Sequence, residues 1–95
     1  YVTSIENDAF LGCSNLEKVT TNAQLQKIGK RAFKNCKKLK NLNIKTTKLK
    51  DNTVGADAFK NTYSTMQVKV PKSKYKAYKK MLKKKGLSSK AHVKK

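Results

Sequence analysis

Residues 28–44 read IGKRAFKNCKKLKNLNI, and the same pattern occurs twice more along the chain. The upstream copy, residues 5–19, reads IENDAFLGCSNLEKV, and a weaker downstream copy starts with VGADAFKNT at residues 54–62. The Ala-Phe pair recurs after 23 and then after 26 residues, at Ala9, Ala32 and Ala58. A near-constant period in the twenties is typical of a solenoid, in which each coil buries its apolar side against the next. The sequence therefore predicts three stacked coils.

The aromatic and alternating aliphatic residues of each repeat identify its buried side. The phenylalanines of the three repeats should stack as a row through the core: Phe10, Phe33 and Phe59. Leu42 and Ile44 alternate with polar residues, which is the pattern of a strand with one buried side. Moving by one repeat in each direction predicts parallel strands side by side at 17–20, 41–45 and 66–70. The opposite wall is predicted to consist of Val2, Ile5, Leu25 and Ile28.

The segments between the predicted strands differ in detail. Asp8 and Asp57 directly precede the Ala-Phe pair, where a carboxylate favours the start of a short helical turn. Arg31 occupies the same position in the middle repeat, so a cap is not required there. Residues 45–53 are polar and make the stretch between the second and third repeats three residues longer than the matching stretch between the first and second, which predicts a loop bulge. Leu49 should turn inward from this loop, in the role of Leu25.

The C-terminal part of the chain changes character after Pro71, which ends a predicted strand. Ser73 is expected to cap a helix over about residues 73–85, and Gly86 to end it. One side of this helix is apolar, with Met81 beside the stripe Tyr75, Tyr78 and Leu82, and should cover the end of the solenoid. The tail, residues 87–95, is either a short strand around Ala91–Val93 or a loose tail. We interpret the chain as one domain, 1–95, with repeats at about 1–23, 24–49 and 50–70.

The charge is large and uneven. The chain carries 24 Lys+Arg and 5 Asp+Glu, a formal net charge of +19. Residues 1–26 contain one base and three acids, a net charge of −2, whereas residues 27–95 contain 23 bases and two acids, a net charge of +21. This balance indicates an anionic partner: nucleic acid, acidic polysaccharide, teichoic-type polymer or anionic lipid. Lys outnumbers Arg 23 to 1, which favours a diffuse electrostatic surface over base-edge or bidentate phosphate readout.

Written as Ile-x-x-x-Ala-Phe-x-x-Cys-x-x-Leu-x-x-Leu-x-Ile, the repeat resembles the leucine-rich repeat of the BspA type. The middle repeat matches at every position of the pattern: Ile28, Ala32, Phe33, Cys36, Leu39, Leu42 and Ile44. The first repeat departs from it at Thr21, and the third has Thr62 in place of Cys and Thr65 in place of the first Leu. The segment from Val68 to Gly86 is similar to the C-terminal end of such arrays on bacterial cell surfaces.

The resemblance implies an α/β fold: a short leucine-rich-repeat solenoid with a parallel sheet and a C-terminal capping helix. It also implies a secreted or cell-surface bacterial protein that is used in adhesion or binding. No catalytic residue comes with the family. The chain begins within a repeat, so we interpret it as a segment of a longer array, and its open N-terminal end could support self-association. No stretch is long and apolar enough to be a transmembrane segment.

Two groups of polar residues are candidate binding sites. The outward positions of the predicted strands carry lysines and short amides, which suit sugar hydroxyls, carboxylates and sulfates: Lys18, Thr20, Asn41, Asn43, Lys45, Gln67 and Lys69. The polar side of the predicted helix forms a basic patch: Lys76, Lys79, Lys80, Lys83 and Lys84. The alternative for both groups is that they are ordinary solvated residues.

The sequence offers little for catalysis or metal binding. Cys13 and Cys36 are 23 residues apart, in equivalent positions, and are either a disulfide across adjacent coils or two small buried thiols. Two cysteines without neighbouring His or acids make neither a metal site nor an activated nucleophile. His92, the single histidine, is interpreted as a solvated residue near a chain end. We therefore predict no enzyme activity, no metal and no cofactor.

Three functional hypotheses remain open. The first is a non-catalytic binding or adhesion module that recognises an anionic polymer, a glycan or a protein of the host or cell wall. The second is a basic nucleic-acid-binding domain. Against it, Tyr75 and Tyr78 are assigned to the core stripe, which leaves no exposed aromatic among the lysines for base stacking. The third is a structural spacer whose lysines serve solubility.

Overall fold

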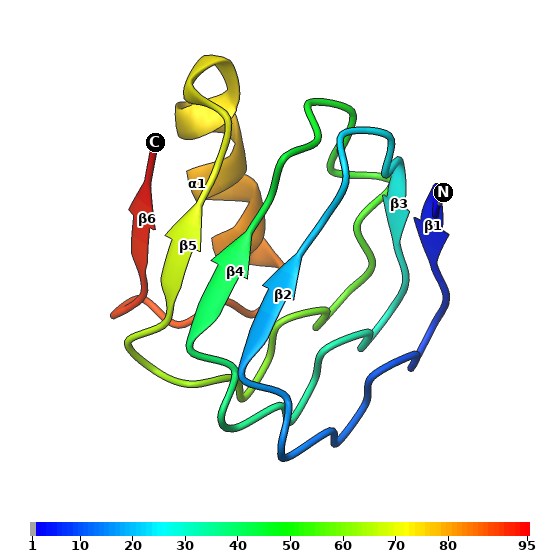
Figure 1. Cartoon of the computed structure of the whole chain (residues 1–95), viewed down its shortest axis with the longest axis vertical. Coiled ribbons are helices and arrows are strands. Elements are labelled where there is room, and N and C mark those ends of the chain that lie inside the picture. Colours follow the sequence, from blue (N-terminus) through cyan, green and yellow to red (C-terminus); the bar gives the residue numbers. More distant parts are fainter. Residues whose placement is uncertain (1) are drawn as a thin grey trace.

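The computed structural model describes residues 2–95, which wind into stacked coils around one elongated core (Figure 1). The main sheet is parallel and consists of β2 (Lys18–Thr20), β4 (Asn41–Asn43), β5 (Gln67–Lys69) and β6 (His92–Lys94), in that spatial order. Across the core, β1 (Ser4–Ile5) pairs in parallel with β3 (Lys27–Ile28). The predicted parallel-sheet solenoid with a C-terminal helix is confirmed.

The register of the main sheet follows the sequence repeat. Val19, Leu42 and Val68 are paired in successive strands, as the repeat predicts. Val93 pairs with Val68 in turn, so the tail forms a strand and not a loose end. Each strand of this sheet has three residues and is therefore shorter than predicted, because the chain turns away to begin the next side of the coil.

Coils are joined by backbone hydrogen bonds outside the strands as well. The N–H of Phe10 donates to the carbonyl of Ala32 over 2.8 Å, and the N–H of Phe33 donates to that of Ala58 over the same distance. The N–H of Phe59 donates to the carbonyl of Lys85 over 3.0 Å. Lys85 follows the C-terminal helix directly, so the helix end occupies the place that alanine has in the other coils.

The turns before the Ala-Phe pairs are not helical, and the predicted carboxylate caps are wrong. Asp8, Arg31 and Asp57 have φ angles of 61°, 53° and 59°, in the left-handed region. That backbone conformation is incompatible with a right-handed helical turn. The carboxylate of Asp8 instead accepts a 2.8 Å hydrogen bond from Nε of Arg31, the equivalent residue of the next coil.

The predicted phenylalanine row is confirmed. The rings of Phe10 and Phe33 stack with centroids 5.2 Å apart and planes 3° apart, and those of Phe33 and Phe59 stack at 5.5 Å and 8°. Phe33 and Phe59 are fully buried, whereas Phe10 is 39% exposed because, within residues 2–95, no coil covers its N-terminal side. Leu25, Ile28 and Leu49 are buried, as predicted.

The C-terminal cap consists of a 3-10 turn, η1 (Lys72–Lys74), and helix α1 (Tyr75–Lys84), which lies behind the C-terminal strands of the sheet (Figure 1). Ser73 does not cap this helix: Lys74 is the N-cap residue, and it makes no side-chain cap hydrogen bond. The 3-10 turn has already begun there, with the N–H of Lys74 donating to the carbonyl of Pro71 over 2.9 Å.

Gly86 ends the helix, as predicted. Its φ angle is +98°, and its N–H donates to the carbonyl of Lys83 while the N–H of Leu87 donates to that of Leu82. These two bonds form a Schellman motif, which requires a left-handed residue after the helix.

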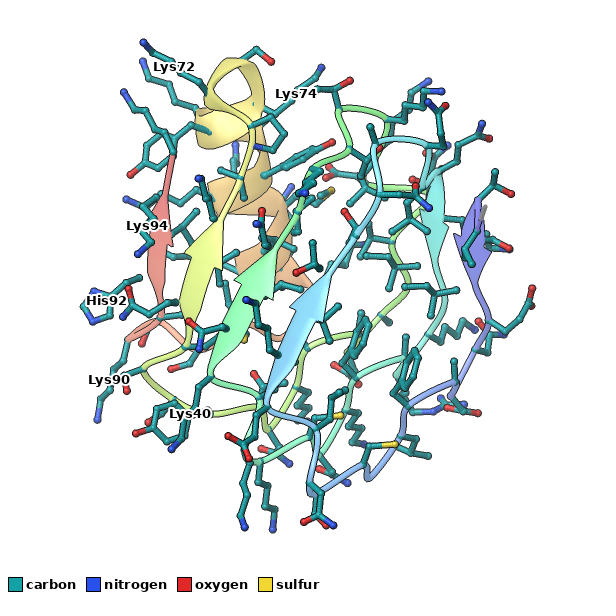
Figure 2. All side chains as sticks on the ribbon, in the orientation of Figure 1. Lys40, Lys72, Lys74, Lys90, His92 and Lys94 are labelled. Atoms are coloured by element: carbon teal, nitrogen blue, oxygen red, sulfur yellow. The ribbon has the colours of Figure 1, made fainter. Side chains whose placement is uncertain are left out.

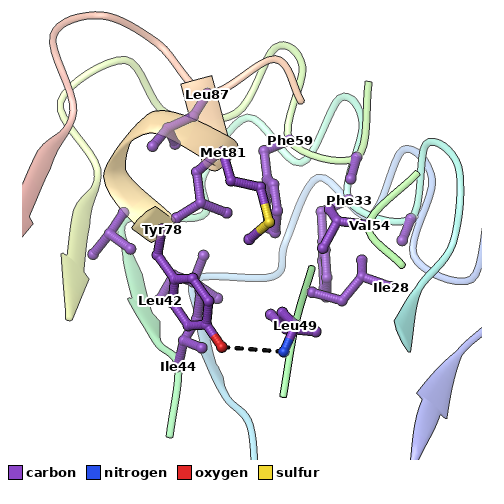
Figure 3. Close-up of a cluster of buried hydrophobic side chains, with 14 of the residues drawn as sticks. Ile28, Phe33, Leu42, Ile44, Leu49, Val54, Phe59, Tyr78, Met81 and Leu87 are labelled. Carbon is purple, nitrogen blue, oxygen red and sulfur yellow. Dashed lines mark hydrogen bonds between the residues drawn. The ribbon is translucent and has the colours of Figure 1, made fainter. Parts of the chain in front are cut away.

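One tyrosine fastens the cap to the coils. Tyr78 is 1% exposed. Its hydroxyl donates to the carbonyl of Thr46 over 2.9 Å. It also accepts from the N–H of Leu49 over 3.1 Å (Figure 3). The hydroxyl of Thr46 donates in turn to the carbonyl of Leu25 over 2.6 Å. The loop between the second and third repeats is thus held between the preceding coil and the helix.

We expect Tyr78→Phe to destabilise the protein by about 1–3 kcal/mol, because it leaves a buried N–H and a buried carbonyl without a partner. Urea unfolding measures this as a lower midpoint at an unchanged slope. Tyr75→Phe is the control, since Tyr75 is half-buried and its ring stays in place. Equal losses in the two variants would contradict the anchoring role of the Tyr78 hydroxyl.

The same substitution should change the dependence of stability on pH. Burial raises the pKa of Tyr78 above its usual value of 10.0. The contribution of the neutral phenol to the free energy of unfolding is therefore complete below pH 10, and it is lost as pH rises through the pKa of Tyr78 in the folded state. The free-energy difference between wild type and Tyr78→Phe should shrink in that window.

Of the two glycines with positive φ, substitution of Gly86 should destabilise the protein and substitution of Gly12 should not. A Cβ at Gly86 would lie 2.9 Å from the backbone nitrogen of Lys60, whereas one at Gly12 meets nothing within 4 Å. We expect Gly86→Ala to cost at least about 1–2 kcal/mol from the left-handed conformation alone. Gly12→Asn should be neutral within about 0.5 kcal/mol, because Asn35 and Asn61 have φ angles of 65° and 59° in the equivalent positions. Thermal unfolding of both variants checks this.

Candidate binding surface

The outward side of the main sheet carries two rows of polar residues, set by the strand register. The first row contains Lys18, Asn41, Gln67 and His92, and the second contains Thr20, Asn43, Lys69 and Lys94. We call these eight residues, together with Lys45, the sheet face. Figure 2 shows His92 and Lys94 projecting from β6 at the edge of the molecule.

All seven residues predicted from the strand pattern lie on this surface. Six of them belong to the two rows, and Lys45 follows β4 directly. A shallow hollow of about 170 Å³ lies between the rows and is lined by Lys18, Asn41, Leu42, Asn43, Gln67, Lys69 and Lys94. A second hollow of about 240 Å³ adjoins it, lined by Asn43, Ile44, Lys45, Lys69, Val70 and Pro71. Their role in binding stays a prediction.

His92 and Lys94 were not assigned to this surface from the sequence. The signal that could have found them is the similarity between His92-Val93-Lys94 and Gln67-Val68-Lys69, which are 25 residues apart. That distance lies within the range of the repeat period, and the two segments pair in register. His92 is exposed, as predicted, but it is part of the first row.

The charge of the sheet face is positive and has no acid within the two rows. Of the acids in the described residues, Asp8 pairs with Arg31, and Asp51 lies 3.6 Å from Lys84. The hydrogen bond from Arg31 lowers the pKa of the Asp8 carboxyl. Glu17 precedes β2 and is the acid nearest in sequence to the rows. The surface therefore offers ammonium and amide donors to an anionic or hydroxylated ligand.

The predicted basic patch lies on the exposed side of α1. Four of its residues line a hollow of about 480 Å³ together with Tyr75: Lys76, Lys79, Lys80 and Lys83. We call these four lysines the helix face. The fifth predicted residue, Lys84, is exposed and points its ammonium to Asp51. The helix face is thus separate from the one ion pair that α1 makes in residues 2–95.

Tyr75 packs against the core, as predicted, but it is not fully covered. Tyr75 is half-buried, and the ammonium groups of Lys79 and Lys95 lie 5.5 and 5.4 Å from its ring centroid. Tyr63 is 38% exposed, with the ammonium of Lys40 at 5.4 Å from its ring. Aromatic rings therefore do lie among the lysines, each with an ammonium already at cation–π distance.

Neither cysteine is in a disulfide. Cys13 is half-buried and Cys36 is fully buried. The thiol of Cys36 donates to the carbonyl of Phe10 over 3.1 Å, and burial raises its pKa. Both observations describe an inert structural thiol. Across residues 2–95, no group of three or more His, Cys, Asp or Glu side chains is arranged to hold a metal ion.

The N-terminal end of the solenoid exposes the predicted apolar cross-section. Val2, Phe10 and Leu11 are exposed, and a hollow of about 300 Å³ reaches inward to Phe33. Whether copies of the chain associate through this end stays a prediction.

The comparisons with known proteins identify the repeat. The family model described as "BspA type Leucine rich repeat region (6 copies)" matches residues 1–91. No curated protein and no solved structure matches the chain. In the part of the chain that the structure describes, no helix has the length and apolar character needed to cross a membrane.

The burial of the two thiols predicts their order of reaction. Iodoacetamide should label Cys13 at least about tenfold faster than Cys36 under native conditions, because the second thiol becomes accessible only on opening of the coil. Peptide mapping after timed labelling measures both rates. Urea is the control, since it should bring the two rates together. A disulfide found by non-reducing mass spectrometry would contradict the structure.

Proposed function

The chain belongs to the BspA-type leucine-rich repeat family, and from this membership we propose that it is a non-catalytic module that binds an anionic partner through its sheet face. The family is generally non-catalytic and is typically used for binding at the cell surface. The proposal places the chain in a secreted or cell-surface bacterial protein that is used in adhesion. Its partner would be an anionic polymer, a glycan or an acidic protein of the host or cell wall.

The observation that carries this proposal is the composition of the hollow on the main sheet. Lys18, Lys69 and Lys94 supply ammonium groups around it, and Asn41, Asn43 and Gln67 supply amides. Ammonium groups pair with carboxylate, sulfate or phosphate, and amides donate to and accept from hydroxyl groups. Parallel strands repeat this set at a spacing of about 4.8 Å, which suits a ligand with recurring groups.

Nucleic acid is the second candidate, and the lysines beside Tyr63 and Tyr75 favour it. Single-stranded nucleic acid binds where aromatic rings accompany basic residues. Both rings, however, already have an ammonium at cation–π distance, and the chain has a single arginine, Arg31, whose guanidinium is paired with Asp8. Binding to nucleic acid would therefore rest on charge alone.

We expect the chain to bind a sulfated polysaccharide with an affinity that falls steeply as salt rises, because binding releases counterions. Titration calorimetry at two salt concentrations measures it. The variant Lys18→Gln/Lys45→Gln/Lys69→Gln should lose at least about tenfold in affinity, or about 1.4 kcal/mol.

The control variant has the same net charge as the sheet-face variant, but its three lysines are removed elsewhere: Lys27→Gln/Lys30→Gln/Lys60→Gln. It should bind within about threefold of wild type, since these residues lie outside the main sheet. Equal losses in the two triple variants would contradict a site on the sheet face. Absence of binding at low salt would leave the lysines as solubilising groups of a structural spacer.

A further inference from the structure

The helix face concentrates like charges on one side of α1. Lys76 and Lys83 are each three or four residues from Lys79 and Lys80, so these side chains are neighbours on the helix surface. Like charges at these spacings destabilise a helix. Of the lysines of α1, Lys84 alone is within ion-pair distance of an acid in residues 2–95. An external anion would relieve this repulsion.

Strand β6 forms the edge of the sheet face that lies next to helix α1. On one side, His92 and Lys94 continue the two rows of the main sheet. On the other side, Lys95 lies over the ring of Tyr75, which also carries Lys79 of the helix face. β6 is the last strand of the sheet, so no further strand separates the two surfaces. In Figure 2, Lys72 lies above β6 and Lys90 below it.

We propose that the sheet face and the helix face form one continuous track around β6, along which a linear anionic polysaccharide wraps the C-terminal end of the solenoid. This rests on the proposed function and names its ligand class. Neither face contains an acid: Glu17 directly precedes Lys18 of the sheet face, and Asp51 pairs with Lys84, which lies outside the helix face. Tyr75 holds Lys79 and Lys95 in place, which reduces the side-chain ordering that binding requires.

The chemistry favours polysaccharide over nucleic acid at this track. Lysine ammonium groups are compact point charges without the planar fork that arginine offers to phosphate. The amides of the sheet face can donate to and accept from the hydroxyl groups that a polysaccharide carries along its length. The ring of Tyr75, which lies beside the track, is shared by two ammonium groups and so is not an open stacking platform.

The effect of ligand length on binding tests whether the two faces form one continuous track. The molecule measures 30 × 26 × 21 Å. Heparin-type fragments shorter than 21 Å should bind in a ratio of two per protein, one at each face. Fragments longer than 30 Å should bind in a ratio of one to one, and with an affinity at least about tenfold higher, because the second contact becomes intramolecular. Titration calorimetry on the full chain measures both the ratio and the affinity.

The variants separate the track from the proposed site. Lys76→Gln/Lys79→Gln/Lys83→Gln should abolish the gain with length and leave one site for short fragments. Its thermal midpoint should not fall, because the substitutions remove like-charge pairs. Two long fragments per protein, or no effect of this variant, would overturn the track while leaving binding at the sheet face intact.

The remaining outcomes are equally distinct. If Lys18→Gln/Lys45→Gln/Lys69→Gln binds short and long fragments as wild type does, the proposed function itself fails. If single-stranded DNA of matched charge and length binds more tightly than the polysaccharide, the ligand class is wrong. The charge-matched control Lys27→Gln/Lys30→Gln/Lys60→Gln should retain the gain with length, and its loss would reduce the effect to net charge.

Discussion

Each coil of this protein must satisfy its backbone on the coil beside it. A strand of three residues has no internal hydrogen bonds, and buried N–H and C=O groups without partners are costly. The solution is a set of bonds between equivalent positions of adjacent coils, in the strands and in the turns. This constraint fixes the register, and the register stacks the phenylalanine rings and aligns the polar rows.

The same constraint explains the two ends of the solenoid. At the C-terminal end, Lys85 offers its carbonyl to Phe59 as an alanine would, and Tyr78 satisfies two further backbone groups. The helix therefore ends the stack without leaving the last coil unpaired. At the N-terminal end no such element covers Phe10, which keeps one side of its ring exposed. The basic residues gather at the closed end, and the acidic ones are concentrated in the first coil.

The sequence predicts those features that depend on the repeat. A fixed period places Phe10, Phe33 and Phe59 in one row and Leu42 beside Val68, because equivalent residues of stacked coils must be neighbours. The six outward residues of β2, β4 and β5, and Lys45 after β4, follow from the same alternation. Leu49 was found although its loop is longer, because it is the apolar residue of a polar segment.

The features that the sequence did not predict are those in which a residue can adopt either of two local conformations. Asp8 is a good helix cap, but it also tolerates the left-handed conformation, and the coil-to-coil bonds select the second. Ser73 lost its capping role to a 3-10 turn that starts directly after Pro71. Tyr75 packs against the core, as its spacing predicts, but its contact with Lys95 depends on the pairing of β6, which is only weakly indicated by the sequence of the tail.

The loop of residues 45–53 shows where this architecture absorbs differences in length. Its three additional residues leave the pairing of β4 with β5 in register and the Ile28–Val54 bridge in place. Thr46 and Tyr78 bind the loop at fixed points, so the surplus chain is confined to one corner. Repeats of unequal size can therefore follow one another in a single stack. New segments could be inserted at that corner without disturbing the hydrogen bonds between coils.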